Sequence, residues 1–436
     1  MTTKTTIRKQ ITRSRRAQAI ALTAAAVLVG AGAIAATANA APGQPVASTS
    51  GGSIGRNSVM QDVAQHVLTA GSPGYVARID DGHRVAFTTS GLADTATGRR
   101  IKSTDQFEIG SNTKTFTSVL ALQQVDRGKL NLDAPVDKYL PGVVPNGKNI
   151  TVRMLLNHTS GLFSYTGDPD FFTELANDPQ HVWTEKELLD VAFKHQPNFA
   201  PGASWSYSNT NYTLIGLILK RQTGMSLADL VEQRIARPLH LSHTYFADPR
   251  ATNTGPGYAH GYAVSFASGK ATYADTSSWP IGGWAGAAGA VISTPTELSR
   301  FFSAVLGGKL FSQNQLKQMK TTVDLPADFP LKGGYGLGLF KIDSPCGTVW
   351  GHGGDTQGHH STAVTSADGR RTAISDSTSD PSDMEMNDGL ARYYEVAFAA
   401  QDVTICEMNN KPVPASITAA LHGTTSTPAP TPSAAS

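Results

Sequence analysis

The sequence predicts an α/β (α+β) protein in which one antiparallel sheet, built from both ends of the chain and flanked by helices, carries an inserted all-helical lobe. Strand-like apolar runs occur within residues 74–89 and again within residues 335–376. Each set contains a two-residue hairpin signal, Asp81-Gly82 and Asp368-Gly369. Helical patterns fill the segment between them. A cleft between two such lobes is a usual place for a functional site.

The first predicted elements are a helix and a strand pair. Residues 57–68 have the spacing of an amphipathic helix, and strands are predicted at 74–80 and 83–89, on either side of the first hairpin signal. A further helix is predicted from about Ser111 to Asp126, and Gly128 marks its end.

Helix-start signals dominate the middle of the chain. Thr184-x-x-Glu187 is a capping box, Ser226-x-x-Asp229 begins another helix, and Thr294-Pro295-x-Glu297 begins a third with proline at its first position. Between the first two signals, residues 212–221 form a strongly apolar helix that ends at Gly224.

Strands return toward the end of the chain. They are predicted at residues 335–342, 348–353, 360–365 and 371–376, and a last helix at about 382–400. The simplest packing pairs these strands with the early ones in a single sheet.

The first forty residues have the layout of a secretory signal peptide. Basic residues at 13–16 precede an uncharged, mostly apolar run at 17–36, and Ala38-Asn39-Ala40 is an A-x-A cleavage site. We therefore expect removal of residues 1–40, secretion, and no stable membrane anchor. The alternative is an uncleaved anchor, because the apolar run is nearly long enough to span a bilayer.

The remaining organisation follows from composition and element order. Residues 41–55, rich in Gly, Ser and Pro, are expected to be a linker, and residues 408–436 a disordered tail. The α/β lobe is assigned to residues 56–130 and 285–407, and the helical lobe to residues 131–284.

Charge and cysteine content exclude several classes of protein. Of 36 Lys and Arg residues, six lie in residues 1–40, which leaves 30 against 34 acidic residues in the rest of the chain. No basic groove for nucleic acid is evident in such a chain. The spacing of Cys346 and Cys406 fits no zinc site. Export makes one disulfide the favoured state, and two buried free thiols are the alternative.

One serine motif lacks its structural context. Residues Gly51-Gly52-Ser53-Ile54-Gly55 match G-x-S-x-G, but that motif works between a strand and a helix, and here it lies in the linker. HExxH and Walker sequences are absent, and we expect neither a metal nor a cofactor.

The first motif with credible chemistry is Ser111-Asn112-Thr113-Lys114, an S-x-x-K at a predicted helix start. A step of three residues places both side chains on one helix face. The helix N-terminus favours negative charge on the serine oxygen, and a neutral lysine amine can take its proton. The alternative is a capped surface helix with an ordinary lysine.

The second motif is Tyr207-Ser208-Asn209, just before the apolar helix. A tyrosine beside a lysine ammonium loses its proton more easily and can then act as a base. The amide of Asn209 offers both a donor and an acceptor to a substrate. The alternative is an ordinary helix cap, made by Asn209 or Asn211, with Tyr207 packed nearby.

The third motif is His352-Gly353-Gly354, on or at the end of a predicted strand. Glycines there allow a substrate backbone to pair with an exposed strand edge. The alternative is a plain turn. The three motifs occur together and in this order, with the second one inside the helical insertion, so separate chance explanations become less credible.

These residues resemble the serine penicilloyl-recognising hydrolases, the group of class C β-lactamases and D-alanyl-D-alanine carboxypeptidases. The chain looks most similar to the secreted actinomycete type of DD-carboxypeptidase, and the resemblance runs from about Arg56 to Glu407. The segments that carry it, besides the three motifs, are residues 155–162, 201–202, 207–212, 284–293, 335–339 and 351–354. The resemblance implies a β-lactamase/transpeptidase-like fold, which agrees with the predicted element order.

The resemblance also implies roles for individual residues. Ser111 would be the nucleophile that forms an acyl-enzyme, and Lys114 and Tyr207 would share the proton transfers, without an assignment of which is the acylation base. His352 stands where related enzymes have lysine or histidine. The oxyanion hole would consist of the backbone N–H groups of Ser111 and Asp355. The substrate-binding residues would be Asn209, Trp284, Gly353, Gly354 and Asp355, and the disulfide would join Cys346 to Cys406.

Three departures from the carboxypeptidase pattern bear on specificity. Asp355 stands where a hydroxyl residue commonly helps to bind the substrate's terminal carboxylate, which an aspartate would repel. A carboxylate-binding arginine of the same group aligns with Phe340, and strand alternation directs the adjacent Lys341 elsewhere. His352-Gly353-Gly354 replaces the Lys-Thr-Gly of β-lactamases and also resembles the D-aminopeptidase branch.

We therefore predict a secreted, monomeric serine D-stereospecific peptidase, with DD-carboxypeptidase activity on peptidoglycan-type peptides as the leading assignment. The partners would be small peptides or peptidoglycan-derived substrates, and also β-lactams, but not nucleic acid. The alternatives are a D-aminopeptidase, amidase or esterase of the same fold, a β-lactamase, and a non-catalytic penicilloyl-binding or sensor protein.

Overall fold

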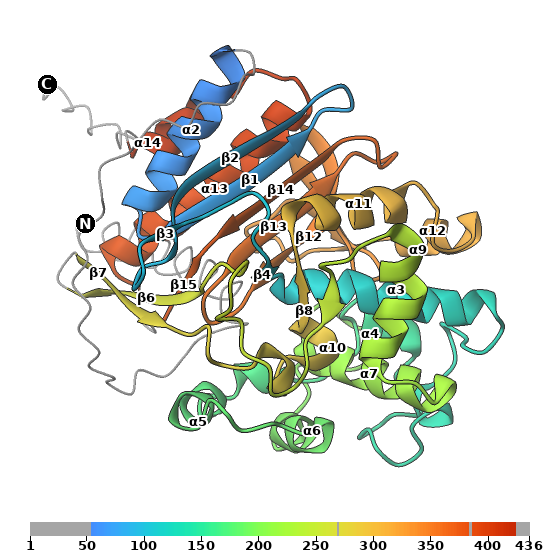
Figure 1. Ribbon diagram of the computed structural model, residues 1–436. Helices are drawn as coiled ribbons and strands as arrows, with labels where there is room; N and C mark the ends of the chain where they lie inside the picture. Colours follow the sequence, from blue (N-terminus) through green and yellow to red (C-terminus); the bar gives the residue numbers. More distant parts are fainter. Residues whose placement is uncertain (1–53, 268–269, 383–385, 424–436) are drawn as a thin grey trace, which may run out of the picture.

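The computed structural model describes residues 54–267, 270–382 and 386–423 (Figure 1). The expected signal peptide and Ser53 of the G-x-S-x-G match lie outside the described residues. The main element is an antiparallel sheet of nine strands in the order β3-β2-β1-β14-β13-β12-β11-β10-β9.

Both ends of the chain meet at the centre of this sheet. β1 (Gly74–Asp80) pairs with β14 (Thr372–Ser377) in the register Tyr75↔Ser377, which confirms the predicted sheet. The other strands are β2 Val85–Asp94, β3 Arg99–Arg100, β9 Val323–Asp324, β10 Gly333–Tyr335, β11 Phe340–Ser344, β12 Gly347–Asp355 and β13 His360–Thr365.

Helices cover both faces of the sheet (Figure 1). On one face lie α2 (Ile54–Thr69), α13 (Asp388–Met408) and α14 (Ala415–His422), whose apolar side chains share one core with β1 and β11. On the other face, α11 (Pro295–Leu306) contacts β1, β13 and β14 and joins the core of the helical lobe.

The helical lobe meets the sheet near β12 and is built around two buried helices. α3 (Thr113–Asp126) and α7 (Asn209–Thr223) contact each other, and both contact the short α10 (Gly286–Gly289). The remaining helices are α4 Val152–Leu156, α5 Phe171–Asn177, α6 Glu185–Phe193, α8 Leu227–Val231, α9 Arg237–Leu239 and α12 Gln313–Met319. Short helical turns are η1 Gly110–Asn112, η2 Val136–Lys138, η3 Tyr165–Gly167, η4 Glu232–Ala236 and η5 Ile281–Gly283.

Two small sheets complete the fold, and some of their strands fall in the range expected to be all-helical. One sheet has the order β4-β8-β5 and the other β15-β6-β7. Their strands are β4 Phe107–Glu108, β5 Tyr245–Phe246, β6 Tyr262–Ala267, β7 Lys270–Asp275, β8 Val291–Ser293 and β15 Ser379–Pro381. The segment 131–284 therefore contains β5, β6 and β7 as well as helices.

The predicted helix starts agree with the structure. Thr184 and Glu187 form both hydrogen bonds of a capping box. The Ser226 and Thr294 side chains accept hydrogen bonds from backbone N–H groups three residues on. Gly224 ends α7 in the left-handed conformation at φ 69°. Local side-chain chemistry thus decides where these helices begin and end.

Three sequence-based expectations differ from the structure in the last quarter of the chain. Residues 335–342 are not one strand, because the chain turns between β10 and β11 at Gly338, whose φ of 73° suits glycine. The expected disordered tail contains α14, whose Ile417 and Leu421 are buried against the α2–α13 face. The last long helix, α13, begins at Asp388 instead of about residue 382 because Asn387 caps it.

Cys346 and Cys406 form a disulfide that links the β11–β12 turn to the end of α13. No described helix is both long enough and apolar enough to cross a membrane.

Candidate active site

Ser111 lies in η1, a single turn that leads into α3 at the end of β12. Gly110 precedes it with φ +50°, and a Cβ there would lie 2.7 Å from the Asp355 carbonyl oxygen and 2.8 Å from its nitrogen. This close approach brings the backbones of Ser111 and Asp355 together. Glycine is required because any other residue would force the two segments apart.

The backbone N–H of Asp355 points toward this contact. Thr356 N donates to His359 O across to β13. Because successive N–H groups of a strand point to opposite sides, the Asp355 N–H faces away from β13 and toward η1. Two backbone donors, from Ser111 and Asp355, can therefore stabilise an oxyanion.

Lys114 lies one turn further along, fully buried at 0% exposure. Its Nζ donates to Ser111 Oγ at 2.9 Å and to the carbonyl oxygen of Ala288 at 2.9 Å. Burial lowers the pKa of Lys114 well below its usual value, and the charge of Asp355 offsets this effect only in part. A neutral amine at this distance can take the serine proton.

Tyr207 covers Lys114, with its ring centroid 4.7 Å from Nζ. Burial raises the pKa of Tyr207 well above 10, and a hydrogen bond with Ser111 opposes the shift. The phenol is therefore protonated at neutral pH, contrary to the tyrosinate hypothesis. The arrangement favours Lys114 as the base and Tyr207 as a proton donor.

His158 is a residue of this site that the sequence reasoning did not single out. It is fully buried with φ 64°, and its ring lies 4.4 Å from that of Tyr207. Nδ1 accepts from Ser208 N at 3.2 Å and pairs with Asn211 Nδ2 at 3.1 Å. His158 thus packs against Tyr207 and helps to hold it in place. The sequence signal that could have identified His158 was its place in residues 155–162, one of the segments that carry the family resemblance.

His352 is buried beside Tyr207 and does not line the cleft. Its Nδ1 lies 2.6 Å from the Gly353 carbonyl oxygen, which can only accept, so Nδ1 carries the hydrogen. Nε2 then accepts from the Tyr335 hydroxyl at 3.0 Å. Burial and the charge of Lys114 lower the pKa of His352 to about 3, so its ring is neutral.

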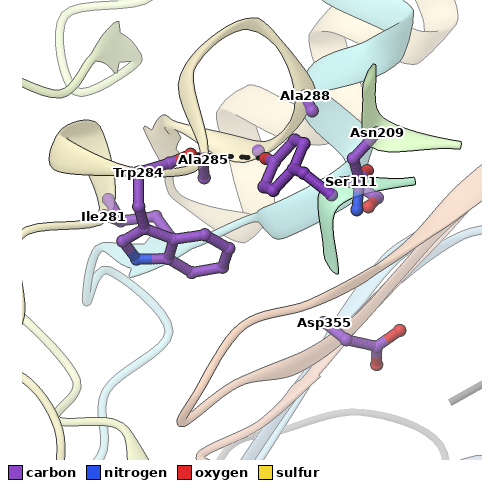
Figure 2. Close-up of a pocket in the computed structure, with 9 residues that line it drawn as sticks. Ser111, Asn209, Ile281, Trp284, Ala285, Ala288 and Asp355 are labelled. Atoms are coloured by element: carbon purple, nitrogen blue, oxygen red, sulfur yellow. Dashed lines mark hydrogen bonds between the residues drawn. The ribbon is translucent and has the colours of Figure 1, made fainter. Parts of the chain in front are cut away.

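A cleft of about 340 Å³, open to solvent, lies next to Ser111 (Figure 2). Among the predicted site residues, Ser111, Asn209, Trp284 and Asp355 line it. Figure 2 shows Asn209 beside Ser111, with Trp284 and Asp355 further round the cleft. The sequence reasoning missed the other lining residues, which are Tyr165, Ile281, Ala285, Ala288 and Gly289.

The two glycines of the third motif do not line this cleft. A Cβ on Gly354 would lie 2.0 Å from the Ile109 carbonyl oxygen, so Gly354 allows β12 to approach η1. Gly353 is partly exposed on the same strand. The plain-turn alternative is wrong, because both residues lie within β12.

Asn209 presents an unused acceptor beside the serine. Its Nδ2 donates to Thr166 Oγ1 at 2.9 Å, while its buried Oδ1 has no hydrogen-bond partner among the described residues. The α7 N-cap is Ser208, without a side-chain bond, so neither Asn209 nor Asn211 caps the helix. A buried free acceptor is costly and fits a substrate N–H.

Asp355 is the one charged side chain among the described residues that line the cleft. Its Oδ1 lies 2.5 Å from His360 Nδ1. Burial disfavours the His360 cation, but the charge of Asp355 and this hydrogen bond outweigh burial, so the pKa of His360 is raised. No described residue hydrogen-bonds Oδ2 of Asp355.

The family follows from comparison of the whole sequence. The family described as Beta-lactamase matches residues 60–397. The chain belongs to this family. It is a serine hydrolase of the penicillin-binding and β-lactamase fold.

Two curated relatives match different lengths of this chain. Penicillin-binding protein 4* of Bacillus subtilis is 28% identical over 310 residues, which are 69% of this chain and 67% of the relative. A beta-lactamase of Escherichia coli is 30% identical over 219 residues, 48% of this chain. The match spans about half of that relative, 55% of its length.

Solved structures of similar proteins share the fold over most of their length. A D-stereospecific amidohydrolase from Streptomyces sp. has 38% identity and a TM-score of 0.68, and covers 74% of this chain and 94% of its own. A D-amino acid amidase from Ochrobactrum anthropi, complexed with L-phenylalanine, has 25% identity and a TM-score of 0.69, and covers 81% and 99%.

The environment of Lys114 predicts the pH dependence of acylation. With p-nitrophenyl acetate, which has no ionising amine, kcat/KM should rise with pH through the lowered pKa of Lys114, because the ammonium form cannot take the serine proton. The rise should be centred below pH 10.5, the usual pKa of a lysine. No fall should follow up to pH 10, because the pKa of Tyr207 lies well above that value.

The matched variant is Asp355→Asn. Because the charge of Asp355 raises the pKa of Lys114, its removal should shift the rising limb to lower pH. A limb centred at or above pH 10.5 in the native enzyme, or a shift to higher pH in the variant, would contradict a Lys114 base.

Proposed function

We propose that this protein hydrolyses amides of D-amino acids that carry a free amino group, as a D-aminopeptidase or amidase acting through an acyl-enzyme. The observation that carries the proposal is the charge of the cleft: among the described residues that line it, the only charged side chain is the acidic Asp355. A carboxylate attracts the substrate ammonium and repels a substrate carboxylate.

The names of the similar structures support this substrate class. The Streptomyces protein is a D-stereospecific amidohydrolase and the Ochrobactrum protein a D-amino acid amidase. Their resemblance to this chain, together with Asp355, makes D-amino acid amides the first substrates to test.

The proposed acylation uses only groups of the described site. Lys114 Nζ takes the proton of Ser111, and Oγ attacks the substrate carbonyl carbon. The Ser111 and Asp355 N–H groups stabilise the oxyanion, while Asn209 Oδ1 accepts a substrate N–H. Tyr207 gives its proton to the leaving amine as the C–N bond breaks, and recovers one from Lys114. Water then hydrolyses the acyl-enzyme by the reverse proton transfers.

DD-carboxypeptidase activity, the leading expectation from sequence, becomes the second candidate. Its support is the family resemblance in the sequence, and one relative is named penicillin-binding protein 4*. The position of the expected carboxylate-binding arginine counts against it, because Phe340 packs on Tyr335 with ring centroids 4.5 Å apart. The neighbouring Lys341 pairs with Asp343 at 3.2 Å and does not line the cleft.

A β-lactamase and a non-catalytic binding protein both have less support from the site. A β-lactamase assignment must accept the neutral, buried His352 in place of lysine. A non-catalytic binding protein would not need a serine hydrogen-bonded to a buried lysine at 2.9 Å. Assembled chemistry of this kind favours catalysis.

Asp355 should decide between the two peptidase candidates. The native enzyme should release p-nitroaniline from D-Ala p-nitroanilide and little D-Ala from a blocked tripeptide ending in D-Ala-D-Ala. Asp355→Asn should lower kcat/KM for the anilide by about 10- to 100-fold, the range for a lost hydrogen bond to a charged group. Asp355→Thr should improve the blocked peptide.

Asp343→Asn is the matched control, because Asp343 is an exposed partner of Lys341 outside the cleft. It should leave both substrates unaffected. Efficient release from the blocked peptide alone, inhibited by a penicillin, would move the assignment to DD-carboxypeptidase.

Ser111 should be the residue that becomes acylated. Intact-mass spectrometry after brief exposure to a D-amino acid ester should show one acyl adduct on the native protein and none on Ser111→Ala. Turnover by the variant should fall at least about a thousandfold. Ser53→Ala, which removes the serine of the G-x-S-x-G match, should keep both adduct and turnover. An adduct that is lost with Ser53 instead would sink the assignment.

We also propose that the protein is secreted after cleavage of residues 1–40 and acts as a monomer. The A-x-A site supports cleavage. N-terminal sequencing of protein from the culture medium should begin at Ala41, and light scattering should give one chain. Protein retained on membranes with residues 1–40 intact would support the uncleaved anchor.

A further inference from the structure

Asp355 also belongs to a group of three ionisable side chains, together with His360 and Asp380. One oxygen each of Asp355 and Asp380 and one ring nitrogen of His360 all lie within 4.8 Å of one another. Asp355 ends β12, His360 begins β13 directly opposite in the register Asp355↔His360, and Asp380 lies in β15. β15 is itself paired with β6 in the register Asp380↔Ala263. Three strand backbones therefore hold the three side chains in place.

Asp380 is the unusual member of this group. It is buried, with 5% exposure, and its carboxylate has no hydrogen bond from any described residue. A buried carboxylate that receives no hydrogen bond needs a compensating positive charge, and a cation held between Asp355 and Asp380 would supply it.

We propose that Asp355, His360 and Asp380 form a binding site for a divalent transition-metal ion, with Zn²⁺ as the best match. Two carboxylate oxygens and one imidazole nitrogen are a common Zn²⁺ ligand set, with water as the fourth ligand. Ligand atoms of a tetrahedral site with bonds of about 2.1 Å lie about 3.4 Å apart. All ligand atoms lie within 4.8 Å of one another, but Asp355 Oδ1 and His360 Nδ1 are 2.5 Å apart in a hydrogen bond. Metal binding at these two atoms must therefore displace the shared hydrogen and move them apart to about 3.4 Å.

The site shares Asp355 with the amine subsite, and this consequence rests on the proposed function. A metal ion that holds Asp355 competes with the substrate ammonium. Zn²⁺ should therefore raise KM for D-Ala p-nitroanilide without lowering kcat. Substrate and metal would use the same negative wall of the cleft.

A second group of possible metal ligands lies within the described chain, and the test must remove it as a control. Asp62, His66 and His422 also lie within 4.8 Å of one another, on α2 and α14. These side chains are partly exposed and already paired, with His422 Nε2 2.7 Å from Asp62 Oδ2. His422→Gln removes this second cluster without touching the cleft and serves as the parent protein for the test.

The test measures metal binding to the whole mature protein in the absence of substrate. Zn²⁺ is titrated by calorimetry into the His422→Gln parent, and Co²⁺ absorption reports ligation by nitrogen and oxygen. One Zn²⁺ should bind per chain. Asp380→Asn and His360→Gln, each added to the parent, should weaken binding at least tenfold and remove the Co²⁺ bands. Asp343→Asn should change neither.

Thermal unfolding without metal shows whether each variant is folded. If only one of Asp380→Asn and His360→Gln folds, that variant alone is sufficient for the test. No Zn²⁺ binding by the parent, or unchanged binding by the folded variants, would overturn the proposal. Inhibition by Zn²⁺ that persists unchanged in Asp380→Asn would overturn it too. Because binding is measured without substrate, it stands or falls separately from the amidase assignment.

Discussion

The buried amine of Lys114 is the constraint on which the rest of the site depends. Burying a charged ammonium costs several kcal/mol, and no carboxylate within the described part of the chain contacts it directly. The fold instead supplies Ser111 Oγ and the Ala288 carbonyl oxygen as hydrogen-bond partners, and the faces of two tyrosine rings at 4.7 and 5.5 Å. These polar contacts support a neutral amine as well as a cation. Burial therefore lowers the pKa of Lys114 so that it can act as a base. The same burial depends on the packing of α3, α7 and α10 around the amine.

The second constraint is the contact between η1 and β12, where the helical lobe meets the sheet. Gly110 and Gly354 both lack side chains at points where a Cβ would collide with backbone atoms. The same contact places the nucleophile, its oxyanion donors and Asp355 within one cleft. Specificity and catalysis are thus coupled through the backbone, because Asp355 supplies an N–H to the reaction and a carboxylate to the substrate.

The sequence predicted the parts of the fold that local chemistry controls. The strands 74–80 and 360–365 have the predicted bounds, and the Thr184–Glu187 capping box is formed. These depend on alternation, turn residues and caps, all of which are short-range. The turn at Gly338 was missed because a run of apolar residues and glycines looks like a strand in the sequence. Only the tertiary structure shows that Ser118 packs so closely on Gly338 that no side chain fits there. The same holds for α14, whose eight residues become helical only where α2 and α13 cover them.

The same distinction between short-range patterns and tertiary contacts applies to the site. The serine and lysine were predictable from a three-residue spacing, which a helix converts into contact. His158, Tyr165 and Asp380 were not, because they come from a loop after α4, from η3 and from β15, which only the tertiary fold brings near Ser111. Of the three, only Tyr165 lines the cleft. Strand register brings Asp355 opposite His360, and no pattern in the sequence shows that pairing. The family resemblance supplied the roles, but the balance of charge came from the structure.

That balance of charge is the reason we propose an amidase or aminopeptidase in preference to a carboxypeptidase. Asp355 is the solvent-facing member of a mostly buried acidic group that also contains Glu108, Asp376 and Asp380. Two histidines lie among these four acids, where His359 pairs with Asp376 and His360 with Asp355. In a low-dielectric wall such charges act over longer distances than at the surface. Asp355 is the member of this group that lines the cleft, so its charge is the one that a substrate ammonium or carboxylate meets first.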